Sequence, residues 1–311
     1  MKVSLISTIY NEEASIKEFL NGLLSQSHKP DEIIIVDGGS KDKTPEIVNS
    51  FINKGEPIKF IVRPGVNIAQ GRNIAVRNSK NEIIASTDAG CKLDKNWLKN
   101  LVEKYKDDAD VVSGMTIPDP KNEFERCVAE ITVTKIEDID ENNYLPSSRS
   151  ISFKKSAWEK VGGYPEYLYT AEDTLFDINM KKAGFKFVAA KDAIVYWNIR
   201  KNLRALFKQY YLYGKGSKEA GLVTIRGILN SFLNLFSPIG MLILLPSLIS
   251  PYIIVFWLPP FLYIIKPYIS AGLKCYRMDK KVMMFVYGIL VKIMVSLGWF
   301  TGMVTVRNKS K

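Results

Sequence analysis

Residues 227–265 form a run of 39 consecutive residues without a charged side chain, and this run restricts what the chain can fold into. As one α-helix, at about 1.5 Å per residue, it would be nearly twice as long as a hydrocarbon core of about 30 Å. Ser250-Pro251 near its middle predicts a break, with membrane spans over residues 228–249 and 252–270. A third apolar run, residues 282–306, contains one charge, Lys292. We therefore expect an α-helical transmembrane module of two to three spans over residues 227–306.

The charged residues are distributed unevenly along the chain. Asp279 is the single acidic residue after Glu219, although 24% of all residues are charged. This asymmetry predicts a water-soluble domain over residues 1–220, followed by the membrane region. A buried helical core in a large soluble protein is the alternative, but no amphipathic helices remain to cover it. The net charge of +11 suits anionic lipid headgroups or phosphate-bearing substrates. Nucleic acid is not expected as a partner, because no basic run is interleaved with aromatics and no zinc-finger or helix-turn-helix pattern occurs.

Three features predict a multi-pass protein of the cell membrane with its soluble domain in the cytoplasm. Cations gather between the second and third apolar runs, and such short positive loops stay cytoplasmic: Lys274, Arg277, Lys280 and Lys281. The N-terminus enters a strand pattern without the features of a signal peptide. The three cysteines lack metal-ligand spacing, which indicates a reducing compartment. The cations after residue 306 would lie on the far side if all three runs cross, so a re-entrant second run, which contains Pro259-Pro260, stays open.

Residues 200–220 carry cations at near-helical spacing, with apolar and aromatic side chains on another face of the same helix. The cations are Arg200, Arg204, Lys208, Lys215 and Lys218. This pattern is typical of an interfacial amphipathic helix that lies in the headgroup region. A surface helix packed on a sheet would show the same pattern, so both interpretations stand.

The first part of the chain alternates apolar strand patterns with helical patterns. Buried strands are expected over residues 2–8, 32–37, 59–64 and 81–88, and a helical pattern begins at Ile16. This alternation predicts the α/β class, a Rossmann-like and mostly parallel sheet flanked by helices. Ligands of such sheets bind beyond the carboxyl ends of the strands.

Polar segments stand at three of these strand ends. They are Tyr10-Asn11-Glu12, Asp37-Gly38-Gly39-Ser40 and Asp88-Ala89-Gly90. Glycine allows the backbone to approach a ligand closely, and a carboxylate accepts hydrogen bonds from a ribose or a base. Three such segments in order predict a nucleotide-type ligand site at this edge of the sheet.

Five ordered segments, STIYNEE, IIIVDGGSKDKT, GRNIAV, STDAGC and GGYPEYLYTAEDTLF, closely resemble glycosyltransferase family 2 with its GT-A fold. The resemblance covers residues 1–220. It implies an inverting transfer of a sugar from a nucleotide-diphosphate donor. It also implies a set of donor-binding residues: Thr8, Tyr10, Glu12, Asp37, Gly38, Arg72, Asn73, Asp88, Ala89 and Gly90.

Within this set the resemblance implies different roles. The first four residues would line the nucleoside pocket, Arg72 and Asn73 would steady the donor, and Asp88 would reach the ribose and a divalent metal. Tyr10 and Asn73 fit turn formation and helix capping equally well.

The chain departs from the family pattern at three positions. Gly38 replaces one of two paired acidic residues, Gly90 replaces a second aspartate, and Trp197-Asn198 stands where many relatives have a histidine. Mg²⁺ or Mn²⁺ prefers oxygen ligands, so Asp88 is the single candidate ligand of this motif and the need for a metal stays open. Asp94 is an alternative second carboxylate, or Arg72 and Lys92 neutralise the diphosphate instead.

The acidic pair Glu172-Asp173 precedes an amphipathic run and is therefore expected at the N-terminal end of a helix. The resemblance implies that this pair is catalytic, with Asp173 as the general base that deprotonates the acceptor hydroxyl. Helix capping by Thr170 or Asp173 is the alternative. Gly162, Gly163 and Tyr164 would form the acceptor-side loop.

These observations favour sugar transfer to a lipid-linked or otherwise membrane-proximal acceptor, in glycan, glycolipid or polysaccharide biosynthesis. The expected partners are a nucleotide-sugar donor, a lipid-linked or glycan acceptor, and membrane lipids. A catalytically inactive, membrane-bound nucleotide-sugar scaffold is one alternative. A processive polysaccharide synthase is another, although residues 209–213 keep only the glutamine of the Gln-x-x-Arg-Trp element.

Overall fold

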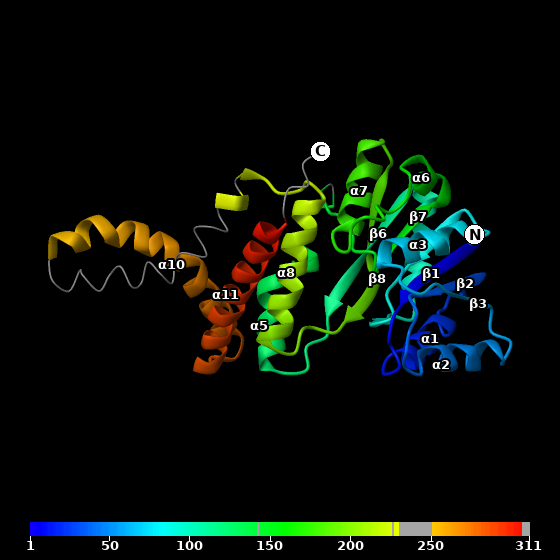
Figure 1. Ribbon diagram of the computed structural model, residues 1–311, viewed down its shortest axis with the longest axis horizontal. Coiled ribbons are helices and arrows are strands. Elements are labelled where there is room, and N and C mark those ends of the chain that lie inside the picture. Colours follow the sequence, from blue (N-terminus) through cyan, green and yellow to red (C-terminus); the bar gives the residue numbers. More distant parts are fainter. Residues whose placement is uncertain (142, 226, 230–250, 307–311) are drawn as a thin grey trace. The chain divides into compact units, whose positions relative to one another are not determined.

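The computed structural model describes residues 1–141, 143–225, 227–229 and 251–306 (Figure 1). The chain divides into two compact units, Met1–Asp119 with Lys135–Asn198 and Pro120–Thr134 with Ile199–Lys311. The first unit carries the predicted ligand site. The functional boundary that we predict near residue 220 stays a prediction.

The first unit is built on one eight-stranded sheet with the order β3-β2-β1-β4-β7-β6-β8-β5. The strands are β1 (Val3–Ile9), β2 (Glu32–Asp37), β3 (Ile58–Val62), β4 (Ile83–Ser86), β5 (Cys91–Leu93), β6 (Val111–Pro118), β7 (Ile151–Lys154) and β8 (Phe187–Trp197). β1 to β4 run parallel, β7 is antiparallel to β4 and β6, β6 and β8 are parallel, and β5 is antiparallel to β8. The sheet is therefore mixed, and the expected parallel arrangement holds for its first four strands.

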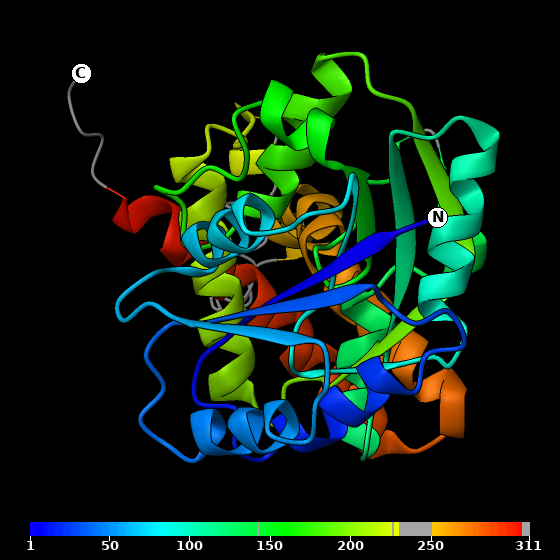
Figure 2. The same ribbon diagram turned by 90° about the vertical axis from the view of Figure 1, so that its right-hand side faces the viewer.

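Helices cover both faces of this sheet. On one face lie α1 (Ile16–Leu24), α2 (Thr44–Ile52) and α4 (Trp97–Glu103), which contribute to one buried cluster. On the other lie α3 (Ile68–Arg77), α6 (Lys155–Lys160) and α7 (Glu172–Lys182), which contribute to a second cluster. Figure 2 shows the blue helices α1 and α2 on the opposite side of the blue strands from the cyan helix α3. Two short 3-10 helices, Lys104–Asp107 and Ile136–Asp138, complete this three-layer α/β unit and its connections.

The apolar runs of the sequence become strands because both faces of the sheet need apolar cover. Ile33, Ile34 and Ile35 of β2 are completely buried, as expected for a strand between two helical layers. The predicted helix from Ile16 is also confirmed, and its apolar stripe faces the sheet. α3 begins with a capping box, in which the Asn67 side chain accepts from the Gln70 backbone N–H and Gln70 returns the bond.

Gly71 brings the first turn of α3 against the end of β1. A Cβ atom added there would lie 2.4 Å from Thr8 Cγ2, so no larger residue fits without displacing the helix. This close contact fixes α3, which carries Arg72 and Asn73, beside the carboxyl end of β1.

The second unit consists of α5 (Glu123–Thr132), α8 (Leu203–Glu219), α10 (Pro251–Asp279) and α11 (Val282–Thr305). Glycines allow these helices to approach closely. Gly298 and Gly302 of α11 face the α8 backbone at Phe207 and Tyr211, and Gly288 faces α10 at Ala271. Arg126 of α5 is bound to Asp279 at 2.5 and 3.1 Å, which ties α5 to the end of α10.

The predicted membrane region maps onto this unit only in part. Residues 230–249 of the first predicted span lie outside the described residues. The second predicted span falls on α10, which begins at Pro251 and extends through Lys274 and Arg277, so these cations are helical. The third apolar run forms α11, which is the one helix in the described part of the chain long and apolar enough to cross a membrane.

Candidate active site

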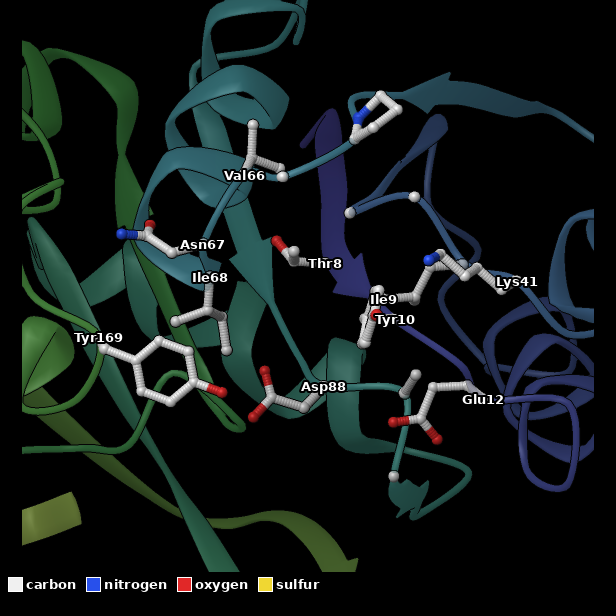
Figure 3. A pocket seen from close by; sticks show the side chains of 16 residues that line it. Thr8, Ile9, Tyr10, Glu12, Lys41, Val66, Asn67, Ile68, Asp88 and Tyr169 are labelled. Atoms are coloured by element: carbon white, nitrogen blue, oxygen red, sulfur yellow. The ribbon is translucent and has the colours of Figure 1, made fainter.

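A pocket of about 660 Å³ opens beyond the carboxyl ends of β1, β2 and β4 (Figure 3). It is lined by residues 8–10, Glu12, 38–39, Lys41, 64–68, 88–90 and Tyr169. All three polar segments that the sequence places at strand ends therefore meet in one cavity. Its volume lies within the usual range for cofactor and ligand pockets.

The pocket contains most of the predicted donor-binding residues: Thr8, Tyr10, Glu12, Gly38, Asp88, Ala89 and Gly90. Asp37, Arg72 and Asn73 are not among its lining residues. Sequence reasoning missed Lys41, the 64–68 loop and Tyr169. Pro64-Gly65 indicates a turn, but nothing in the local pattern places that turn against the DGGS segment.

The buried carboxylate of Asp37 connects the loops that follow β1 and β2 beside the pocket. It accepts hydrogen bonds from the backbone N–H of Ser40 at 3.0 Å and from its hydroxyl at 2.6 Å. Ser40 Oγ in turn accepts from the Asn11 backbone N–H at 2.8 Å, and Asn11 Oδ1 accepts from the Lys41 N–H at 2.9 Å. Asn11 adopts the left-handed conformation, with φ 53°, which asparagine tolerates better than most residues. These hydrogen bonds join the loop after β1 to the loop after β2.

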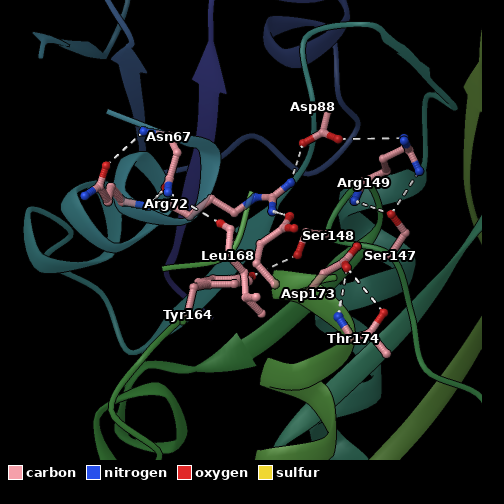
Figure 4. Close-up of polar contacts among 12 residues, drawn as sticks. Asn67, Arg72, Asp88, Ser147, Ser148, Arg149, Tyr164, Leu168, Asp173 and Thr174 are labelled. Atoms are coloured by element: carbon pink, nitrogen blue, oxygen red, sulfur yellow. Dashed lines mark hydrogen bonds and ion pairs between the residues drawn. The ribbon is translucent and has the colours of Figure 1, made fainter. Parts of the chain in front are cut away.

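Arg72 connects the pocket to the acidic pair. Its Nη2 donates to Asp88 Oδ1 at 2.9 Å, and its Nη1 donates to Glu172 Oε1 at 2.6 Å. Figure 4 shows this side chain reaching from α3 toward Asp88, with Arg149 on the other side of that carboxylate. The ring of Tyr164 lies 5.5 Å from the guanidinium carbon, which adds a cation–π contact.

The pKa values of this cluster reflect burial and mutual charge. Burial alone would lower the pKa of Arg72, but the carboxylates of Asp88 and Glu172 raise it above its usual value. Burial and repulsion from Asp173 raise the pKa of Glu172 to about 7, against the attraction of Arg72. A carboxylate that is poised near neutrality within a ligand site is typical of functional centres.

Asp173 is placed differently from Glu172, although the two residues are adjacent. α7 begins at Glu172, and its N-cap residue is Ala171, which has φ 65° and no side-chain oxygen. Asp173 is therefore not the capping residue. Its Oδ1 accepts from the Thr174 N–H at 2.8 Å, and its side chain is partly exposed, whereas Glu172 is buried. The left-handed alanine costs about 1–2 kcal/mol in general, and such strain is often found at functional sites.

Asn73 fastens the predicted acceptor-side loop to α3. Its Nδ2 donates to the Tyr164 carbonyl at 2.8 Å, and its Oδ1 accepts from the Tyr164 N–H and the Trp158 indole N–H at 2.9 and 3.0 Å. Gly162 and Gly163 both have φ 79°, and a Cβ atom on Gly163 would lie 2.7 Å from Asn73 Oδ1. Tyr164 itself is buried and its hydroxyl lies 3.1 Å from Ser148 Oγ.

Arg149 is a basic residue at the site that sequence reasoning missed. Its Nε lies 3.7 Å from Asp88 Oδ2, and its guanidinium carbon lies 4.9 Å from the centre of the Trp197 ring. The sequence signal was a polar SSRS segment directly before β7. Nothing in that segment alone shows that it reaches the end of β4.

The residues near Asp88 do not fit a divalent metal ion. Each oxygen of Asp88 faces a guanidinium group, and Trp197 has no atom that can coordinate a metal. Asp94, the alternative second carboxylate, is not a lining residue and accepts from the Asn96 N–H. Across the described residues no group of three or more His, Cys, Asp or Glu side chains could hold a metal.

A mixed sheet with this strand order, a nucleotide-sized pocket and an acidic cluster at its rim define an enzyme of the GT-A type. The model of Glycosyl transferase family 2 matches residues 4–176, more than half of the chain. The chain therefore belongs to this family and is a glycosyltransferase.

Relatives of known name agree with this assignment. The chain is 25% identical over 228 residues to glycosyltransferase AglE of Haloferax volcanii, covering 71% of this chain and 74% of that protein. It is 27% identical over 224 residues to the O-antigen chain rhamnosyltransferase RfbN of Salmonella typhimurium, covering 68% and 71%. The fold resembles a mannosyltransferase of Pyrobaculum calidifontis in complex with GDP-Man and Mn²⁺, with a TM-score of 0.58, 19% identity, and coverage of 94% and 86%.

Proposed function

We propose that this protein transfers a sugar from a nucleotide-diphosphate donor to a membrane-proximal acceptor, with inversion at the anomeric carbon. The observation that carries this proposal is the continuity between the pocket and the acidic pair through Arg72 and Asp88. A donor whose nucleoside occupies the pocket would direct its sugar past Asp88 toward Asp173.

The pocket suits a nucleoside because two exposed aromatic rings line it. Tyr10 and Tyr169 are 55% and 63% exposed, and they are separated across the opening in Figure 3. Exposed aromatic rings provide stacking surfaces for a base. Asp88, on the same rim, would accept hydrogen bonds from the ribose.

Asp173 is our candidate for the general base. Glu172 is our candidate for a residue that fixes the position of Arg72 beside it. A base must reach the proton that it removes, and Asp173 is partly exposed. Glu172 is buried and bonded to Arg72. Gly162, Gly163 and Tyr164 would then bound the acceptor side.

The acceptor is proposed to be lipid-linked or otherwise close to the membrane. One named relative is an O-antigen chain rhamnosyltransferase, which favours a glycan acceptor. The second unit supports a position close to the membrane. α11 is long and apolar enough to cross a membrane, and only 28% of its most apolar stretch is buried within the protein. Large apolar side chains on α10 and α11 are also exposed: Ile269, Leu273, Val282, Met283, Val286 and Val304. We propose a multi-pass protein of the cell membrane whose catalytic unit faces the cytoplasm.

Nucleotide binding tests the donor pocket with a matched pair of tyrosines. Tyr169 lines the pocket, whereas Tyr167 is 70% exposed two residues earlier and does not. In titrations with UDP and GDP, Tyr169→Ala should weaken binding by roughly tenfold, since stacking on one ring contributes about 1–3 kcal/mol. Tyr167→Ala should bind like the wild type. Equal effects of the two substitutions would contradict the placement of the base.

Turnover separates an enzyme from an inactive scaffold. Membranes that contain the full-length protein should transfer radiolabelled sugar from a nucleotide sugar to extracted lipid or glycan acceptors. If the protein binds the donor but neither transfers the sugar nor hydrolyses the donor in any such mixture, the protein is a catalytically inactive scaffold. Release of the protein from membranes by high salt alone would contradict the proposed spans.

A further inference from the structure

We infer that Arg149 binds the diphosphate of the donor and supplies the positive charge that a divalent metal supplies in metal-dependent enzymes. This inference rests on the proposed function, because it assigns a further residue to the same donor site. It concerns the leaving group, whose negative charge must be balanced as the bond to the sugar breaks. The structure offers few cations that could do this.

Arg72 is not available for the diphosphate. Its side chain is 3% exposed, and both terminal nitrogens donate to carboxylates, one to Asp88 and one to Glu172. A donor could reach it only after these bonds break. Lys41 lies across the pocket from Asp88 in Figure 3, beside Tyr10. Lys92 is exposed on β5 and, unlike Arg149, forms no ion pair with Asp88 among the residues that the structure describes.

Arg149 lies beside Asp88, which lines the pocket, although Arg149 itself is not a lining residue. One quarter of its side-chain surface is exposed, so a ligand can reach it. The separation of 3.7 Å between Arg149 Nε and Asp88 Oδ2 is that of an ion pair and is longer than an ordinary hydrogen bond. A diphosphate oxygen could therefore approach the guanidinium while Asp88 turns toward the ribose.

Two contacts orient the guanidinium in advance. Its guanidinium carbon lies 4.9 Å from the centre of the Trp197 ring, and Nη1 donates to Ser147 Oγ at 3.1 Å. Arginine presents its donors in a planar fork that matches phosphate oxygens, and a stacked guanidinium loses little entropy on binding. Trp197, which cannot coordinate a metal, therefore orients the Arg149 guanidinium group through a cation–π contact.

The surroundings exclude the competing explanation of a metal at the same place. Asp88 would be the single carboxylate ligand, and both of its oxygens already face arginines. Gly90 contributes no side chain. Arg149 itself would repel a divalent cation at this distance. The arginine and the metal are therefore alternatives, and the residues present favour the arginine.

A phosphate series tests the inference on the full-length protein in detergent. Binding of uridine, UMP and UDP, and of the guanosine series, is measured by calorimetry in the presence of EDTA. Arg149→Gln should weaken diphosphate binding by roughly tenfold to a hundredfold, because it removes a charge-assisted contact. Binding of the nucleoside alone should stay unchanged, and the unliganded variant should unfold at the wild-type temperature.

Arg77 provides a matched control. It also lies over an indole ring, 5.9 Å from the centre of Trp158, and also pairs with a carboxylate, Glu166, at 3.2 Å. Glu166 does not line the pocket, whereas Asp88 does. Arg77→Gln should bind all three ligands like the wild type. A second variant, Arg149→Gln with Asp88→Asn, checks whether the loss comes only from the unmasked Asp88 charge. Our inference expects the diphosphate to lose its advantage over the nucleoside in this double variant too.

The outcomes are distinct. If Arg149→Gln binds the diphosphates as tightly as the wild type, or if the double variant recovers this binding, the inference is wrong and the proposed function is unaffected. Wild-type binding that disappears in EDTA and returns with Mn²⁺ would also overturn it. A wild-type protein that binds none of these ligands would contradict the proposed function, and the inference with it.

Discussion

Arg72 donates from Nη1 to Glu172 Oε1 at 2.6 Å, although only 3% and 7% of the two side chains are exposed. The pair joins α3, at the carboxyl end of β1, to the first residue of α7. Because Arg72 also holds Asp88, one buried guanidinium fixes the rim of the pocket relative to the acidic pair. The geometry of the proposed centre therefore depends on a residue that does not line the pocket.

Removal of Arg72 should be strongly destabilising. Arg72→Met leaves the buried Glu172 without its partner and leaves Asp88 with Arg149 alone, and loss of one member of a buried ion pair costs about 3–5 kcal/mol. Arg77→Met removes an exposed arginine that also pairs with a glutamate, and should cost at most about 1 kcal/mol. Chemical unfolding of the two variants beside the wild type measures the difference. Similar small losses would show that the Arg72 cluster contributes little to the fold.

Asp177 should make the stability of the protein depend on pH. It is completely buried one turn after Asp173, and neither of its oxygens has a hydrogen-bond partner among the residues that the structure describes. Burial and repulsion from Asp173 raise its pKa well above the usual value, against Lys181 and Arg72. The folded state thus keeps a proton that the unfolded state releases. The contribution of Asp177 to stability is therefore fully present below about pH 4, the range of an unperturbed aspartate, and is lost as the pH rises toward its raised folded-state pKa.

Asp177→Asn removes this titration and retains the shape of the side chain. Its free energy of unfolding, relative to that of the wild type, should rise between pH 4 and pH 8, because the variant has no buried carboxyl group whose proton the unfolded state releases. Asp192→Asn, at an exposed position, should show no such rise. Parallel unfolding curves for wild type and Asp177→Asn across this range would contradict the burial of an unpaired carboxyl.

Sequence periodicity predicts many of the strands and helices of the first unit. The run EIIIVD predicts a strand over residues 32–37, and β2 has these bounds, because a strand covered on both faces must be apolar throughout. The start of α7 at Glu172 also follows from the amphipathic run after it. Periodicity carries no information on strand direction, so the antiparallel placement of β5 and β7 could not be predicted.

The parts of the site that could not be predicted depend on contacts between distant segments. Arg149 and Asp88 are separated by a long stretch of chain, and only the folded sheet brings them together. The position of Asp37 at a strand end does not indicate that its carboxylate accepts two hydrogen bonds from Ser40. Asp177 stands in a helix whose apolar pattern gave no indication that a carboxyl would be buried.

Gly90 offers a way to introduce a metal site. No atom lies within 4 Å of the position where a Cβ atom would stand, so an aspartate fits there. Gly90→Asp adds a second carboxylate near Asp88, and hard divalent cations bind such oxygen ligands. Mn²⁺ should then tighten binding of UDP or GDP by roughly tenfold in the variant and leave the wild type unchanged. Calorimetry with and without Mn²⁺ measures this, and Gly90→Ala controls for the added side chain. An equal response of both proteins to Mn²⁺ would contradict this prediction.

The most direct test of the proposed mechanism compares Asp173→Asn with Glu172→Gln and Asp88→Asn. Donor binding and sugar transfer are measured for each full-length variant with the same nucleotide sugar and acceptor. Asp173→Asn keeps the size of the side chain but removes the proton acceptor, so transfer should fall by about a hundredfold to ten-thousandfold with nearly unchanged donor affinity. Asp88→Asn should weaken donor binding first, because its proposed contact is with the ribose. If Asp173→Asn keeps more than about a tenth of wild-type transfer while Glu172→Gln loses it, Asp173 is not the general base.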